Sequence, residues 1–167
     1  SFDLAAYWAE STARFERGIN RGTAVGPRII RAGRMISQTG GHADVESGDL
    51  DVPACACSMR STVFGIIADS PDAVRKAARH NLRDGSDFLK VHVSGGVATP
   101  SDPLESVQLT HDEIAVAVLE AEHRGTYVAA HAYSPTSIRL AVGAGVHSIE
   151  HGNMIDDEAA ASMAAAG

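Results

Sequence analysis

Three residues of this sequence carry side chains capable of chemistry at positions where the surrounding chain is apolar. Lys90 lies inside one apolar run, and His131 and His151 each end another. A lysine buried in such a run costs free energy while it remains a cation, and imidazole is a common ligand of zinc and similar divalent ions. The residue types therefore indicate a buried site in which the lysine is paired with a carboxylate, reacts covalently or ligates metal.

Three states of Lys90 relieve the cost of its burial, and the sequence leaves all three open. The ammonium can pair with a carboxylate, which is how buried charges are normally accommodated. As a neutral amine it can form a Schiff base, and as a carbamate formed with carbon dioxide it can ligate metal. A single histidine that ends a strand is more often a hydrogen-bonded core residue, but His131 and His151 follow Lys90 on successive runs. That order favours a shared function.

The elements that must position these residues alternate along the chain. Strands are predicted over residues 29–37, 88–93, 127–131 and 146–151. Helices are predicted over residues 3–18, from Ser70 to Gly85, from Thr110 to Gly125, from Ser134 to about Val142, and from about Asp156 onward. Strands that alternate with helices indicate βαβ units and a parallel sheet. Residues 39–69 show no sustained periodicity, so we predict a long loop of the kind that is either functional or disordered.

The pattern of residues 88–93 distinguishes between two α/β architectures. In an open sheet the strands are buried on both faces and are almost continuously apolar. Here the odd positions are all apolar, whereas the even positions include Lys90 and His92. We therefore predict a partial (β/α)8 TIM barrel, with the polar face inside and close to the C-terminal mouth. A complete barrel needs ~250 residues, and about four βα units are visible, so the chain should hold roughly half a barrel.

Composition and charge limit the class of protein and its partners. Hydrophobic residues make up 44% and charged residues 21%, as in soluble globular proteins. The net charge of −7 argues against nucleic acid as a partner, and no run approaches the ~18 apolar residues of a membrane helix. The first residues resemble neither an initiator region nor a signal peptide, so we expect a longer chain or a removed leader. Cys55 and Cys57 are expected to be reduced loop thiols, which favours a cytoplasmic location.

Five short motifs resemble the amidohydrolase superfamily, in particular its imidazolonepropionase-like and Xaa-Pro dipeptidase (prolidase)-like group. Each motif is modest alone, but all of them occur together and in the right order. The motifs are residues 27–29 (PRI), 37–42 (SQTGGH), 88–97 (FLKVHVSGGV), 128–133 (VAAHAY) and 148–153 (SIEHGN). The similarity that they indicate extends over nearly the whole chain.

The resemblance implies a ligand set and a reaction. Lys90 matches the carboxylated lysine that ends the fourth barrel strand and bridges two divalent metal ions, here expected to be zinc. His131 and His151 match the histidine ligands that end strands five and six. A carbamate offers two anionic oxygens to ions ~3.5–4 Å apart. In this family the metals activate a hydroxide that attacks an amide carbonyl, so the implied substrate is a small molecule of the dipeptide or N-acyl amino acid type.

The sequence also departs from the family pattern. A complete member has a His-x-His pair on strand one and an Asp on strand eight, but none of the eight histidines here forms such a pair. The Asp usually moves the proton, so the catalytic residue is unknown. We expect residues 1–167 to be the central part of a longer hydrolase, inactive alone and able to associate with copies of itself. A Schiff-base lyase using Lys90 and a non-catalytic half-barrel are the alternatives.

Several other polar residues are candidates of a second order. His42 and Tyr133 are expected at the mouth of the barrel, where they can contact substrate or simply pack in a loop and at a helix start. The segment from Ser94 to Gly96 can lie close to substrate or form a tight turn. His92 and His147 share predicted strand faces with candidate ligands and remain unassigned. The remaining histidines are expected on solvated helix surfaces, namely His80, His111 and His123.

Overall fold

The computed structural model describes residues 9–44, 65–97 and 102–167. Five parallel strands form a single sheet in the order β2-β1-β3-β4-β5. The strands are β1 (Met35–Ser37), β2 (Gly65–Ile67), β3 (Leu89–His92), β4 (Val128–Ala132) and β5 (Ser148–His151). The helices are α2 (Ala9–Asn20), α4 (Pro71–Arg83), α5 (His111–Glu122), α6 (Pro135–Gly143) and α7 (Asp157–Ala166). The predicted α/β class with a parallel sheet is confirmed.

Four of the helices begin at the residues whose side chains predict a start. Ser70, Thr110, Ser134 and Asp156 each accept a hydrogen bond from a backbone N–H of the first helical turn. Such caps satisfy N–H groups that have no partner within the helix. At α5 the cap is reciprocal, because the Glu113 carboxylate also accepts from the Thr110 backbone N–H at 2.7 Å. Local chemistry therefore fixes where these helices start.

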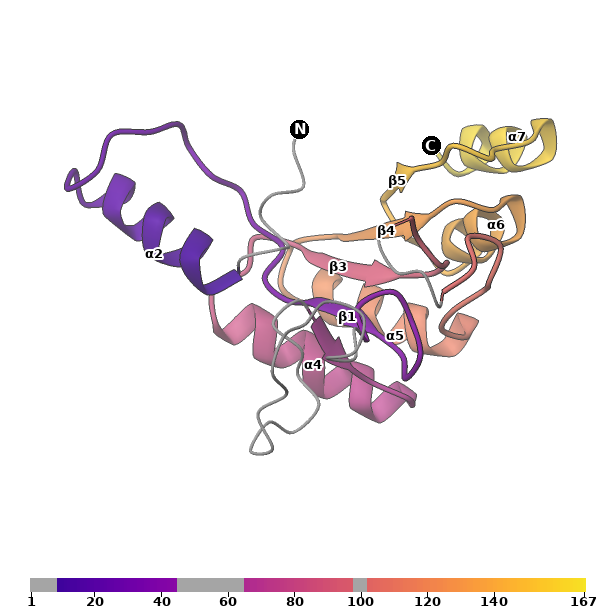
Figure 1. Ribbon diagram of the computed structural model, residues 1–167, viewed down its shortest axis with the longest axis horizontal. Coiled ribbons are helices and arrows are strands. Elements are labelled where there is room, and N and C mark those ends of the chain that lie inside the picture. The colour runs from indigo at the N-terminus through magenta and orange to yellow at the C-terminus, as the bar shows by residue number, and fades with distance from the viewer. Residues whose placement is uncertain (1–8, 45–64, 98–101) are drawn as a thin grey trace.

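One face of the sheet is covered by helices, and this face holds the main hydrophobic core. Figure 1 shows α4, α5 and α6 on the same side of the strands, and each of these helices contacts one or more of β1, β3 and β4. Leu89, Val91 and Val93 belong to this core, as the alternation predicts. Lys90 and His92 are buried on the opposite face. In a barrel, helices cover the outer face, so the Lys90 face corresponds to the barrel interior.

Two details of the predicted strands and loops are wrong. Strand β1 contains only the last three residues of the predicted segment 29–37. Upstream of β1 the backbone bonds to side chains instead, since Arg31 N donates to the Asp87 carboxylate at 2.9 Å and Arg34 N donates to Asn81 at 3.1 Å. The predicted loop of residues 39–69 contains β2, a strand too short to show periodicity. Strand β2 pairs with β1 on the side away from β3, so sheet order differs from chain order.

Helix α2 lies at one end of the molecule and α7 at the other in Figure 1. Cys55 and Cys57, and the first residues of the predicted helix 3–18, lie outside the described residues. Within the described part of the chain, no helix has the length and apolar character needed to cross a membrane.

Candidate active site

The carboxyl ends of β3, β4 and β5 bring the predicted site residues together. Lys90 lies on β3 and is 1% exposed, and His131 lies on β4 and is 4% exposed. His151 is the last residue of β5 and is exposed. Because parallel strands end at one edge of a sheet, side chains near these ends share one site. Lys90 is one of the neighbouring groups that lower the pKa of three histidines in this site, namely His42, His92 and His131.

Four imidazole rings and one phenol ring form the centre of this site. The ring of His131 is stacked on His42, with centroids 4.5 Å apart, and lies edge-on to His151 at 4.7 Å. Tyr133 is stacked on His151 at 5.2 Å. The fourth imidazole, His92, lies 5.0 Å from both His42 and His131. The cluster, which we call the histidine cluster, therefore consists of His42, His92, His131, His151 and Tyr133.

The protonation state of His131 suits a metal ligand. Burial lowers the pKa of His131 to about 3, and the neighbouring His42, His151 and Lys90 add to this effect. The ring is therefore neutral near pH 7. Its Nε2 atom lies 2.8 Å from the carbonyl oxygen of Gly95, and a carbonyl can only accept. Nε2 thus carries the proton, which leaves the Nδ1 lone pair available to a ligand.

His92 is a member of the cluster that the sequence left unassigned. Its ring is 2% exposed, and burial holds its pKa well below the usual value for histidine. Nε2 lies 2.9 Å from the sulfur of Met35, and Nδ1 has no hydrogen-bond partner among the described residues. A buried nitrogen without a partner costs free energy. The shared strand face with Lys90 was the sequence signal that could have placed His92 here.

His151 reaches the cluster through an unusual backbone conformation. Alternation along β5 would direct it to the same face as Ile149, which packs against the main core. Instead, His151 has a φ of 75°, in a region that non-glycine residues rarely adopt. Strain of this kind is concentrated at functional sites. The observation therefore favours a functional position for the His151 ring.

Two further polar residues approach the cluster and were missed in the sequence. Asp102 and Gln108 are 5% and 2% exposed, and they lie in residues 102–110, which precede α5 and contain no helix or strand. The Asp102 carboxylate lies 3.3 Å from Nδ1 of His42, and Gln108 accepts from the His42 backbone N–H at 3.0 Å. Burial outweighs this carboxylate and lowers the pKa of His42. No periodicity in this segment signals either residue.

The donor set at the site includes a lysine, which matters for metal binding. Within the described ranges, no three His, Cys, Asp or Glu side chains are arranged to hold a metal ion. The neutral imidazole of His131 instead lies 4.7 Å from the ring of His151, in a site that also holds the buried Lys90. A lysine ligates metal only as a neutral amine or a carbamate. A carbamate would place anionic oxygens amid the four imidazoles, so these residues fit a metal centre with Lys90 in that form.

The other histidines lie away from the cluster. His80, His111 and His123 are exposed on helices or at a helix end, as predicted. His147 is also exposed, and its ring packs against Tyr127 at 5.0 Å. None of these four rings contributes to the site.

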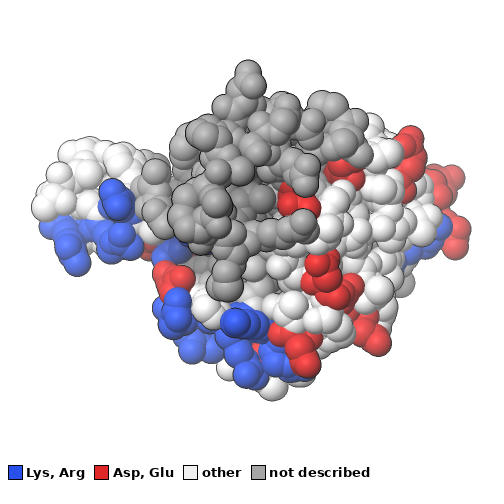
Figure 2. Space-filling model, turned by 60° about the horizontal axis from the view of Figure 1, so that its bottom comes forward, with Lys and Arg blue, Asp and Glu red and all other residues white. Residues whose placement is uncertain are grey.

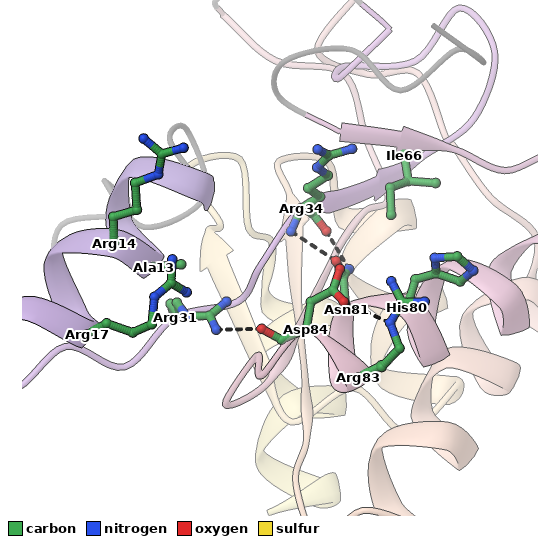
Figure 3. Close-up of a pocket in the computed structure, with 10 residues that line it drawn as sticks. All are labelled: Ala13, Arg14, Arg17, Arg31, Arg34, Ile66, His80, Asn81, Arg83 and Asp84. Carbon is green, nitrogen blue, oxygen red and sulfur yellow. Dashed lines mark hydrogen bonds and ion pairs between the residues drawn. The ribbon is translucent and has the colours of Figure 1, made fainter. Parts of the chain in front are cut away.

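A separate cavity of about 510 Å³ lies between α2, β2 and the end of α4. Five arginines line it (Arg14, Arg17, Arg31, Arg34 and Arg83), and Figures 2 and 3 show basic side chains gathered on this part of the surface. Arg31 donates to Glu16 at 2.7 Å and to the Asp84 carbonyl at 2.8 Å, and Arg83 pairs with the Asp84 carboxylate at 2.9 Å. These contacts tie α2 to α4, so we assign the cavity a structural role.

Together, the parallel sheet, the helices on one face and the lysine–histidine site at the strand ends define part of a hydrolase-type α/β barrel. The model of the amidohydrolase family matches residues 9–167. This chain belongs to the amidohydrolase family.

Known proteins with related sequences and structures agree with this assignment. A solved amidohydrolase structure is 46% identical, with a TM-score of 0.83, and the match covers 92% of this chain and 38% of that one. A solved prolidase complexed with N-methylphosphonate-L-proline is 41% identical, with a TM-score of 0.82 and the same coverage of 92% and 38%. The ochratoxinase of Aspergillus niger is 34% identical over 163 residues, which are 93% of this chain and 33% of the relative. The chain thus spans about a third of the length of the curated relatives that it matches.

Proposed function

We propose that this chain is part of a metal-dependent hydrolase that cleaves amide or peptide bonds in a dipeptide or an N-acyl amino acid. The observation that carries the proposal is that Lys90, His131 and His151 lie on three adjacent parallel strands, with the two histidine rings in contact. Membership of the amidohydrolase family supports hydrolysis. The similarity to a prolidase supports a dipeptide substrate in particular.

In this proposal Lys90, in its carboxylated form, would hold two zinc ions together with His131 and His151. Such a metal pair would supply the chemistry that makes a hydroxide nucleophile available near neutral pH. His131 contributes its Nδ1 lone pair, because its Nε2 proton is engaged by Gly95. The backbone carbonyl fixes the orientation of the ring, as partners of ligating histidines commonly do.

His42 and Tyr133 bind the substrate in this proposal. Both rings belong to the histidine cluster and contact His131, so they can orient a substrate against the proposed metal ligands. Tyr133 offers a phenolic hydroxyl as a donor or acceptor. Its backbone N–H donates to the Ser94 hydroxyl at 2.9 Å, and its ring packs against His131 and His151. A fixed ring loses little entropy when substrate binds.

The experiment that tests the proposal uses the full-length protein that contains this chain. Metal content is measured by mass spectrometry of the purified protein, and hydrolysis is assayed with an Xaa-Pro dipeptide and an N-acyl amino acid. We expect close to two divalent ions per chain and turnover that a chelator removes and zinc restores. Full activity in the metal-free protein would contradict the proposal. Trapping of a substrate imine on Lys90 by borohydride would instead favour a Schiff-base lyase.

A further inference from the structure

The segment between β3 and α5 places a buried carboxylate beside the histidine cluster. Asp102 Oδ1 accepts hydrogen bonds from Gln108 Nε2 at 2.6 Å and from the Ser106 hydroxyl at 3.1 Å. Its other oxygen, Oδ2, lies 3.3 Å from Nδ1 of His42 and has no aligned hydrogen-bond donor among the described residues. Burying a carboxylate is costly unless donors surround it. A proton on Nδ1 of His42 would therefore stabilise the Asp102 oxygen that faces it.

Gln108 holds the other side of the same histidine. Its side-chain oxygen accepts from the backbone N–H of His42 at 3.0 Å, while its amide nitrogen donates to Asp102. Its own backbone N–H donates to the carbonyl of Val93 at 2.9 Å, which ties the segment to the end of β3. Gln108 thus holds the backbone of His42, while Asp102, to which Gln108 is hydrogen-bonded, faces the ring.

Two glycines make this approach possible. A Cβ atom on Gly96 would lie 2.1 Å from Cε1 of His42, so any side chain at this position would displace the ring. A Cβ atom on Gly95 would lie 2.0 Å from the carbonyl oxygen of Pro103, the residue after Asp102. Both distances are far below a van der Waals contact. The Gly95-Gly96 pair therefore admits the His42 ring and the Asp102 segment to the same place.

The donors around Asp102 explain why the residue is an aspartate. Gln108 Nε2 and the Ser106 hydroxyl already donate to one oxygen, and Nδ1 of His42 faces the other. Only an ionised carboxylate accepts at every position, whereas an asparagine would direct an N–H₂ group at one of these partners. The distance of 3.3 Å is longer than that of a strong charge-assisted hydrogen bond, and such contacts often tighten when a ligand binds.

We propose that Asp102 is a positioning residue: its carboxylate holds His42 as the tautomer protonated on Nδ1, so that Nε2 is a hydrogen-bond acceptor at the mouth of the site. The ring it fixes is the one stacked on the proposed metal ligand His131. The consequence for substrate binding rests on the proposed function, whereas the tautomer does not. No feature of the sequence around Asp102 indicates this role.

The tautomer can be observed directly in the full-length protein labelled with ¹⁵N-histidine. Two-bond ¹⁵N–¹H correlation spectra distinguish a protonated from an unprotonated ring nitrogen, and the signal missing in His42→Gln assigns the residue. We expect a protonated Nδ1 and an unprotonated Nε2. In Asp102→Asn the amide oxygen can keep Gln108 and Ser106 while the N–H₂ group faces His42, so the proton should move to Nε2. An Nε2-protonated wild type, or an unchanged tautomer in Asp102→Asn, would overturn the proposal.

Glu105→Gln is the matched control, because it makes the same carboxylate-to-amide change at an exposed residue three positions from Asp102. It should leave the tautomer unchanged and kcat/KM for an Xaa-Pro dipeptide within about twofold. Asp102→Asn should lower kcat/KM roughly 10- to 100-fold, as removal of orienting partners commonly does. Thermal unfolding of each variant confirms that it folds.

A double-variant cycle separates positioning from a general structural role. If Asp102 acts through His42, the variant with both His42→Gln and Asp102→Asn should be no slower than His42→Gln alone. Losses that multiply would mean that Asp102 acts independently, which overturns the proposal. If the wild-type protein hydrolyses none of the substrates, the proposed function fails, and the NMR result still decides the tautomer.

Discussion

The imidazole rings of His42 and His131 are stacked, with centroids 4.5 Å apart and planes inclined by 20°. His42 lies in the loop after β1 and His131 lies on β4, and β3 separates these two strands in the sheet. Burial lowers the pKa of both rings, so both are neutral near pH 7. Two neutral rings can stack without the repulsion that two imidazolium ions would feel. A histidine must be uncharged to bind a metal ion, so the neutral rings are compatible with the proposed metal site.

Replacement of Lys90 tests whether it is a ligand. Lys90→Ala should remove most of the bound metal and abolish hydrolysis in the full-length protein, with partial rescue by a short-chain carboxylic acid that supplies the missing oxygens. Lys90→Arg should not restore either property, because a guanidinium stays cationic and cannot ligate metal. Metal analysis and a dipeptidase assay give both readouts. Normal metal content and rate in Lys90→Arg would mean that Lys90 is structural.

Gly96→Ala should impair the site without unfolding the protein. The added Cβ would lie 2.1 Å from the His42 ring, which must therefore move. We expect kcat/KM to decrease at least about tenfold, because small displacements of positioned groups have large kinetic effects. Gly143→Ala in α6 is the control, since its Cβ would meet nothing within 4 Å. Equal kinetics in Gly96→Ala and wild type would show that the position of His42 is unimportant.

The metal-free protein should lose stability in acid. The pKa of His131 is about 3 in the folded state, whereas an ordinary histidine has a pKa of 6.5, so the unfolded chain binds the proton first. The contribution of His131 to the free energy of unfolding is therefore fully present above pH 6.5, and it decreases as the pH falls towards 3. One such group changes the free energy of unfolding by up to about 1.4 kcal/mol per pH unit. Urea unfolding between pH 7.5 and 4.5 measures this slope.

Two variants check the origin of that slope. His131→Gln should make the free energy of unfolding less dependent on pH, because the group that titrates is gone. His111→Gln, at an exposed residue at the start of α5, should leave the slope unchanged. An identical slope in His131→Gln and wild type would assign acid sensitivity to other residues.

Removal of the α5 cap should lower stability by an amount typical of helix caps. Thr110→Ala eliminates the side chain that accepts from the Glu113 backbone N–H, and it also leaves the Glu113 carboxylate with one fewer donor. The free energy of unfolding should decrease by about 1 kcal/mol. Thr110→Ser retains the hydroxyl and should lose much less. Chemical denaturation of the three proteins gives the comparison, and equal losses in both variants would exclude the cap as the cause.

The sequence by itself determined the features that depend on neighbouring residues. The caps at Ser70, Thr110, Ser134 and Asp156 act on N–H groups a few positions away, so the residue types predict where those helices start. The alternation along β3 likewise separates the core face from the face that carries Lys90. Since strands in βαβ units run parallel, the sequence also predicted that residues near successive strand ends would meet. The metal and substrate roles of these residues remain predictions.

Tertiary structure alone decided the features that depend on distant partners. Residues 29–34 lost their predicted strand because Asn81 and Asp87 bond to their backbone. His151 joined the cluster because its backbone leaves the extended conformation, whereas alternation predicts the opposite face. Asp102 and Gln108 reach His42 from a segment without periodicity, through contacts between residues far apart in the chain. Such contacts arise from packing, which no local pattern of residues encodes.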